Sequence, residues 1–203
     1  ELFTTGINYY REHIKPTARI HYQIEKAGDV VNVVPDKAQI WVRVRENDRE
    51  SLNVVYERVK KMAAAGALMA EVEHEIQLIS GIYEILPNRR GAEAVQANFE
   101  MLGPIKYTKS EDRYAKAIQK ETGKPQVGMD GAIHPIKDTM PAQGGSTDVG
   151  DVSQIVPVVR LSAPAAPKDA PWHSWAVVAC TGMSIGHKGM IQATKVLGMT
   201  MVD

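Results

Sequence analysis

The sequence predicts an α/β protein whose first half is a ferredoxin-like α+β sandwich without its first strand. Two stretches of alternating apolar and polar residues, at 19–25 and 38–45, are typical of half-buried strands. A stretch with helical spacing and a third alternating stretch, at 71–79, follow them, so the order up to that point is α-β-β-α-β. One strand before the first helix would complete the split βαβ pattern of the ferredoxin-like fold. We therefore expect the chain to begin inside a fold.

The helices of the first half have local start and stop signals. Apolar residues at helical spacing predict a helix over 2–14, and Pro16 ends it because proline lacks an amide hydrogen and clashes with the preceding turn. A turn at Gly28-Asp29 follows the first strand. Asp48 is a favourable N-cap for the second helix, because its carboxylate can accept a hydrogen bond from an amide of the first turn.

The second half is predicted to be mainly helical. The expected elements are helices at 90–102 and 110–122, a Gly- and Pro-rich loop at 123–145, a buried strand at 154–161 and a helix at 174–202. Ser110 is the expected cap of the second of these helices, and the last one is expected to break near Gly182 or Gly186. A single strand cannot form a sheet, so we expect this half to need further chain segments as partners.

Composition excludes several classes of function. Twenty-four Lys and Arg residues balance 24 Asp and Glu residues, so the chain lacks the basic footprint of a nucleic-acid-binding protein. No apolar run is long enough to cross a bilayer, so no membrane association is expected. The single cysteine, Cys180, has apolar neighbours, which favours a buried, inert thiol over a nucleophile. One cysteine also fits a reducing compartment, so we expect a cytoplasmic protein.

His173 is the strongest single candidate for a metal-binding residue. It lies in Pro171-Trp172-His173-Ser174, between a loop rich in Pro and Ala and a long apolar helix. A neutral imidazole is a good ligand for zinc and similar ions. The alternative is a capping or packing histidine, because no second ligand lies nearby in the sequence.

A second polar loop, Gly144 to Ser153, combines glycines, hydroxyls and two carboxylates. Ser146, Thr147 and Asp148 could bind a substrate carboxylate or an oxyanion through hydroxyls and exposed amides. The alternative is helix capping, with Thr147 as the cap and the acids in the first turn. The two interpretations are compatible.

Two further residues lie in the first half. Arg45, on the polar side of the second strand, carries a guanidinium that suits a carboxylate, although a solvated surface arginine is the default. Asn32, before Val33-Val34-Pro35, is either a turn residue or a ligand donor.

Four motifs in order resemble one family: "INYYREHI", "RIHYQIEKAGDVVNVVPDKAQIWVRVR", "GGSTDVGDVSQIVP" and "APWHSWAVVA". Together they look like the di-zinc aminoacylase/carboxypeptidase family of metallopeptidases, and within it a branch of amidohydrolases acting on aminobenzoyl-glutamate. The resemblance implies a catalytic α/β domain that binds two divalent metal ions, zinc or manganese. A ferredoxin-like lid domain interrupts that domain and forms a homodimer. Residues 1–82 would be the incomplete lid/dimerisation domain, and 83–203 the C-terminal part of the catalytic domain.

The same resemblance assigns roles to individual residues. His173 matches the last metal ligand of the family, and Ser146 and Thr147 match the loop that lines the substrate pocket. Asn32 and Arg45 match lid residues that reach the carboxylate of the substrate, in several members across the dimer. In the family, the other metal ligands and the glutamate base precede the point at which this chain begins. We therefore expect a fragment with no catalytic residue of its own, no tightly bound metal and no activity by itself.

The function implied by the resemblance is metal-dependent hydrolysis of the amide bond of an N-acyl amino acid such as p-aminobenzoyl-glutamate. A dipeptidase or aminopeptidase of the same family is an alternative. A non-catalytic dimerisation or binding module is an alternative from another class.

Overall fold

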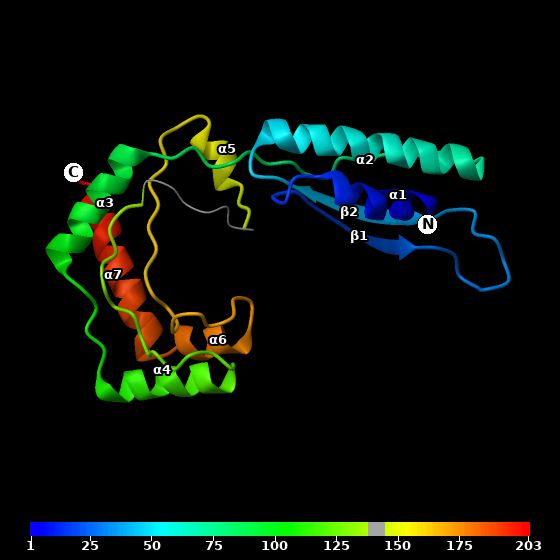
Figure 1. The fold of residues 1–203 in the computed structure, drawn as a ribbon. Helices are drawn as coiled ribbons and strands as arrows, with labels where there is room; N and C mark the ends of the chain where they lie inside the picture. Colours follow the sequence, from blue (N-terminus) through cyan, green and yellow to red (C-terminus); the bar gives the residue numbers. More distant parts are fainter. Residues whose placement is uncertain (138–144) are drawn as a thin grey trace. The chain divides into compact units, whose positions relative to one another are not determined.

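A computed structural model of the chain describes residues 1–137 and 145–203 (Figure 1). The described residues form two compact units. The first comprises Glu1–Leu86 with 145–155, and the second comprises 87–137 with Val156–Asp203. Mixed helices and a small two-stranded sheet are consistent with the α/β class expected from the sequence.

The first unit is built on an antiparallel hairpin covered by helices on one face. Its elements are helix α1 (Leu2–Tyr10), the short 3-10 helix η1 (Arg11–His13), strands β1 (Arg19–Lys26) and β2 (Gln39–Arg45), and helix α2 (Arg49–Ala70). Both predicted strands are confirmed, with Ile20 opposite Val44 and Tyr22 opposite Val42. The side chains of these four residues face the helices. There Ile20 forms a core with Ile7, Ala18, Val55 and Val59, and the other three pack against it. The other face of the hairpin carries the polar residues of both strands.

Helix α2 begins as the sequence predicts. The Ser51 amide donates a 2.7 Å hydrogen bond to Asp48 Oδ1, and this bond holds the pKa of the Asp48 carboxyl below its usual range. The helix approaches α1 closely at Gly66, where a Cβ atom would lie 3.2 Å from Phe3. It ends at Glu71, whose φ of 54° is left-handed.

The third predicted strand, at 71–79, is wrong. Residues 72–88 form neither helix nor strand, and the side chains of Val72, Leu78 and Ile79 are 61%, 67% and 75% exposed. A strand needs an edge to pair with, and within residues 1–137 and 145–203 β1 and β2 pair only with each other. The alternating pattern is present, but no described neighbour supplies the hydrogen bonds.

The second unit is a set of four helices: α3 (Arg89–Leu102), α4 (Lys109–Glu121), α6 (Trp175–Thr181) and α7 (Ser184–Thr200). Helix α3 contacts α7, and Asn98 Nδ2 donates a 3.0 Å hydrogen bond to Thr200 Oγ1 between them (Figure 1). Helices α4, α6 and α7 meet around Ala115, Ile118, Ala176, Cys180 and Ile185. Cys180 is fully buried, as expected, and burial raises the pKa of its thiol.

Three predictions for the second half can be compared with the structure: a strand, a helix cap and a helix break. The strand predicted at 154–161 is wrong, since Gln154 is the C-cap of helix α5 (Val149–Ser153) and the following residues form no strand, with Ile155 85% exposed. Thr108, not Ser110, caps α4, because its hydroxyl reaches the Glu111 amide at 3.2 Å. The predicted break of the last helix is confirmed at Gly182, between α6 and α7.

Candidate functional site

His173 lies in a tight turn immediately before α6. Its φ is +59°, in the left-handed region that few residues other than glycine adopt, although histidine is among those enriched there. The side chain is exposed, and Ser174 Oγ closes the turn by donating a 2.5 Å hydrogen bond to the Pro171 carbonyl. A turn held in this way presents the imidazole to solvent, as a ligand or substrate-contacting residue requires.

Gln119 of α4 supports the loop that leads to this turn. It is fully buried, and its amide nitrogen donates to the carbonyl of Lys168 at 3.0 Å. Its side-chain oxygen accepts a 2.8 Å hydrogen bond from the Gly128 amide. One buried side chain therefore ties the loop before His173 and the loop after α4 to the same helix.

The helix that follows His173 is anchored in the core of the second unit. Ala176 and Cys180 are fully buried, while Tyr114 of α4 donates a 3.0 Å hydrogen bond to the Ala179 carbonyl. The first turn of α6 is therefore fixed, and with it the position of the preceding turn.

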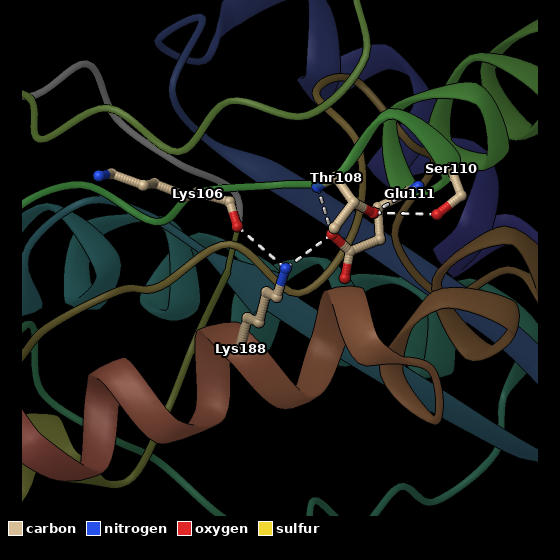
Figure 2. A network of polar contacts seen from close by, with 5 residues as sticks. All are labelled: Lys106, Thr108, Ser110, Glu111 and Lys188. Carbon is tan, nitrogen blue, oxygen red and sulfur yellow. Dashed lines mark hydrogen bonds and ion pairs between the residues drawn. The ribbon is translucent and has the colours of Figure 1, made fainter.

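An ion pair that was not predicted from the sequence joins α4 to α7, between the buried carboxylate of Glu111 and the half-buried Lys188 (Figure 2). Lys188 Nζ lies 2.7 Å from Glu111 Oε2 and also donates to the Lys106 carbonyl at 2.9 Å. The lysine bond, with the Thr108 amide bond, lowers the pKa of Glu111 to about 2. The Thr-x-x-Glu spacing of a capping box at 108–111 was the sequence signal that could have found this carboxylate.

The polar loop of the first unit forms the short helix α5 (Val149–Ser153) and the residues before it. Ser146 is exposed, and Thr147 Oγ1 accepts a long 3.4 Å hydrogen bond from the Val149 amide. Asp148, the residue at the N-cap, makes no side-chain capping bond, so the side-chain contact with the first turn is the long bond to Thr147, the expected cap, and Asp151 also lies in that turn. Gly144, also assigned to this loop, lies outside the described residues.

Helix α5 binds the segment at 83–86. Asp151 Oδ1 accepts from the Tyr83 amide at 2.8 Å, and Ser153 Oγ accepts from the Leu86 amide at 2.9 Å. Gly150 makes this approach possible, because a Cβ atom there would lie 1.9 Å from the Tyr83 carbonyl oxygen. Three residues of the motif thus have a structural role that the sequence analysis did not assign.

Asn32 and Arg45 are not brought together. Asn32 is exposed in the turn between the two strands, and Arg45 is half-buried at the far end of β2, opposite Arg19. At a rise of about 3.3 Å per residue, the length of β2 alone separates the two ends of the hairpin by about 20 Å. The two residues therefore do not contact one small substrate group within the same chain.

His173 belongs to no described cluster of metal-ligating side chains. Among residues 1–137 and 145–203, no group of three or more His, Cys, Asp or Glu side chains is arranged to hold a metal ion. A structural or catalytic zinc site takes three or four protein ligands. A metal held by His173 would therefore need ligands beyond those that the structure describes.

Three named proteins are similar to the chain, while no family model matches it. It is 31% identical to a subunit of the p-aminobenzoyl-glutamate hydrolase of Escherichia coli (strain K12), over 100% of the chain and 47% of that protein. It is 22% identical to Xaa-Arg dipeptidase of Mus musculus, over 98% of the chain and 40% of the dipeptidase. For Xaa-Arg dipeptidase of Homo sapiens the identity is 24%, over 76% of the chain and 30% of the dipeptidase.

These relatives support a hydrolase of the peptidase family that the four motifs resemble, since each is named as a hydrolase or a dipeptidase. The chain spans less than half the length of each of them. Within the part of the chain that the structure describes, no helix combines the length and the apolar character needed to cross a membrane.

Proposed function

We propose, from its homology to one hydrolase and two dipeptidases, that this chain is part of a metal-dependent amidohydrolase that cleaves the amide bond of an N-acyl amino acid. The alignment of the whole chain with the p-aminobenzoyl-glutamate hydrolase of Escherichia coli carries the proposal. An aminobenzoyl-glutamate-like substrate follows from that relative's name. The chain would act as one part of a longer enzyme and be inactive by itself.

His173 would be the metal ligand that this chain supplies. Its exposure and its fixed turn before α6 support this role. Two zinc or manganese ions would complete the site in the whole enzyme, where bound metal polarises the scissile carbonyl and lowers the pKa of its water. Gln119 would hold the loop that carries the imidazole.

Residues 1–82 would be the lid and dimerisation domain, and 83–203 would belong to the catalytic domain, including the stretch at 145–155 that belongs to the first unit. Ser146 and Thr147 would line the pocket, and the exposed hydroxyl of Ser146 suits a substrate carboxylate. Asn32 and Arg45 lie at opposite ends of the hairpin, so they would serve different groups or different copies of the site in a homodimer.

A dipeptidase is the second candidate, because two relatives are named Xaa-Arg dipeptidase. A dipeptide and an N-acyl amino acid share the amide bond and the terminal carboxylate, so the same residues would serve both. The single buried cysteine supports a cytoplasmic enzyme, since buried thiols without disulfides suit a reducing compartment.

The test is a comparison of His173→Ala with His187→Ala in the native protein that contains this chain. Both histidines are exposed, so either change should leave folding intact. His173→Ala should lower metal content and abolish hydrolysis of aminobenzoyl-glutamate and Xaa-Arg dipeptides, whereas His187→Ala should change neither. Full metal content and activity in His173→Ala would disprove the ligand role. Absence of hydrolysis and of metal in the unchanged protein would favour a dimerisation or binding module.

A further inference from the structure

A cationic hollow lies where η1 turns into β1. It has a volume of about 410 Å³ and is lined by Arg11, Ile14, Lys15, Pro16, Ala18, Arg19, Ile20 and His21. We propose that this hollow binds a small organic carboxylate, with its hydrocarbon part on the apolar floor and its carboxylate among the cations. The proposal is independent of the amidohydrolase function, since none of these eight residues is assigned a role in it.

The cations around the hollow are held by neutral acceptors. Arg11 donates to Asn8 Oδ1 at 2.7 Å and to the Ile20 carbonyl at 2.6 Å, and Arg19 donates to the carbonyls of Pro16 and Ala18. Lys15 Nζ donates to Ser51 Oγ at 3.1 Å. Across residues 1–137 and 145–203, no carboxylate lies within ion-pair distance of these three cations. Lys15 does act through space on Asp48, where it contributes to the lowered pKa.

The register of the hairpin adds positive charge next to the hollow. Arg19 lies opposite Arg45 and His21 lies opposite Arg43, on the face of the sheet away from the helices. Like charges directly opposite each other on a sheet are destabilising. Positive charge therefore gathers next to the hollow, and this favours an anion as its ligand.

Arg11 is already positioned for a ligand. Besides its two hydrogen bonds, its guanidinium lies 5.4 Å from the centre of the Tyr22 ring, and Tyr22 OH in turn accepts a 3.2 Å hydrogen bond from Asn8 Nδ2. A guanidinium has five N–H donors, so those two bonds leave donors for a carboxylate. Because the side chain is held beforehand, binding would cost little of its conformational entropy.

The floor of the hollow determines the class of anion. Pro16 is exposed and Ile14 is half-buried, so these two supply the apolar surface of the hollow, whereas Ala18 and Ile20 are buried in the core and offer almost none. An inorganic anion gains nothing from this surface, whereas an aliphatic chain gains from each buried methylene group. The combination favours a carboxylate with a short hydrocarbon tail over phosphate.

The experiment is an NMR titration of the ¹⁵N-labelled full chain with hexanoate, with inorganic phosphate in a parallel series. Hexanoate should give saturable shifts of the amides around 14–21 and should bind more tightly than phosphate. Arg11→Gln and Arg19→Gln should each weaken hexanoate at least about tenfold, the loss typical of one charge-assisted hydrogen bond. Arg58→Gln, which removes the same charge from an exposed position on α2, should leave the affinity unchanged.

Each other result contradicts a stated part of the proposal. Absence of saturable shifts, or equal weakening by Arg58→Gln, would show that the hollow is not a specific site. Phosphate binding as tight as hexanoate binding would disprove the role of the apolar floor. Far-ultraviolet circular dichroism on every variant identifies misfolding, and if one arginine variant misfolds, the other decides the question.

Discussion

Lys188 Nζ lies 2.7 Å from Glu111 Oε2 and joins α7 to the first turn of α4. The two residues are 77 positions apart in the chain, so the pair closes the second unit over a long loop. Glu111 is 7% exposed, and its carboxylate also accepts from the Thr108 amide.

Lys188→Met should destabilise the second unit, because it leaves the Glu111 carboxylate buried without its cation. We expect a loss of about 2 kcal/mol in the free energy of unfolding, the order of an unsatisfied buried charged group. Urea denaturation followed by circular dichroism measures it. The control is Lys60→Met, which breaks the exposed pair with Glu57 and should cost much less, because solvent screens an exposed pair. Equal losses in the two variants would contradict the prediction.

The stability of the chain should depend on pH through Glu111. Its pKa is about 2 in the folded chain, below the ordinary value of 4.5, so the folded state is favoured when the carboxyl is ionised. This contribution is complete above pH 4.5 and is lost as the pH falls toward 2. Asp48, Asp112 and Asp130 have lowered pKa values as well and act in the same direction.

Glu111→Gln separates the glutamate from these aspartates. The difference in unfolding free energy between the unchanged chain and Glu111→Gln should shrink between pH 5 and pH 3, about the span over which the unfolded carboxyl titrates. A difference that stays constant over that interval would rule out Glu111 as a source of the pH dependence.

Gln119→Leu should loosen the two loops that this side chain ties to α4. The change removes the partners of the Gly128 amide and the Lys168 carbonyl, and each buried polar group left unsatisfied costs about 1–3 kcal/mol. Hydrogen exchange of the Gly128 amide should accelerate, along with a lower unfolding midpoint. Gln96→Leu, at an exposed contact with Glu100, is the matched control and should have little effect.

Gly150→Ala should separate α5 from the segment at 83–86. A Cβ atom at Gly150 would lie 1.9 Å from the Tyr83 carbonyl oxygen, so one of the two backbones must move. We expect a loss of about 1–3 kcal/mol, the usual cost of overpacking. Gly198→Ala in α7 meets nothing within 4 Å and should be neutral or stabilising, which thermal unfolding of the two variants will show.

The left-handed turn at His173 predicts a ranking of variants. Val at this position should cost about 1–2 kcal/mol, because a β-branched residue is disfavoured at positive φ. Gly adopts the same φ freely, so His173→Gly should be close to the unchanged chain in stability. Equal unfolding midpoints for the Val and Gly variants would contradict the left-handed turn.

Local signals predicted the elements whose partners lie close in the sequence. The alternation at 19–25 and 38–45 predicted the hairpin correctly, because its two strands pair with each other. The capping residue Asp48 predicted the start of α2. The strands at 71–79 and 154–161 failed because an alternating or apolar run shows a preference for a sheet and not the presence of an edge to join.

The same distinction between local and long-range features holds for the candidate site. The position of His173 just before a helix and the buried thiol of Cys180 were predicted from their neighbours in the sequence. The Glu111–Lys188 pair and the Gln119 contacts join segments far apart in the chain, which a single sequence does not reveal. The separation of Asn32 from Arg45 needed the register of the hairpin.

The exposed segment after α2 has a consequence for how the chain behaves in concentrated solution. Its apolar side chains, Val72, Ile76 and Leu78, would make it a candidate for stacking into intermolecular β-structure. Glu71, Glu73 and Glu75 alternate with them, so copies stacked in register would place carboxylates of like charge directly above one another. We therefore expect these glutamates to act as gatekeepers that oppose association of the exposed apolar segment at neutral pH.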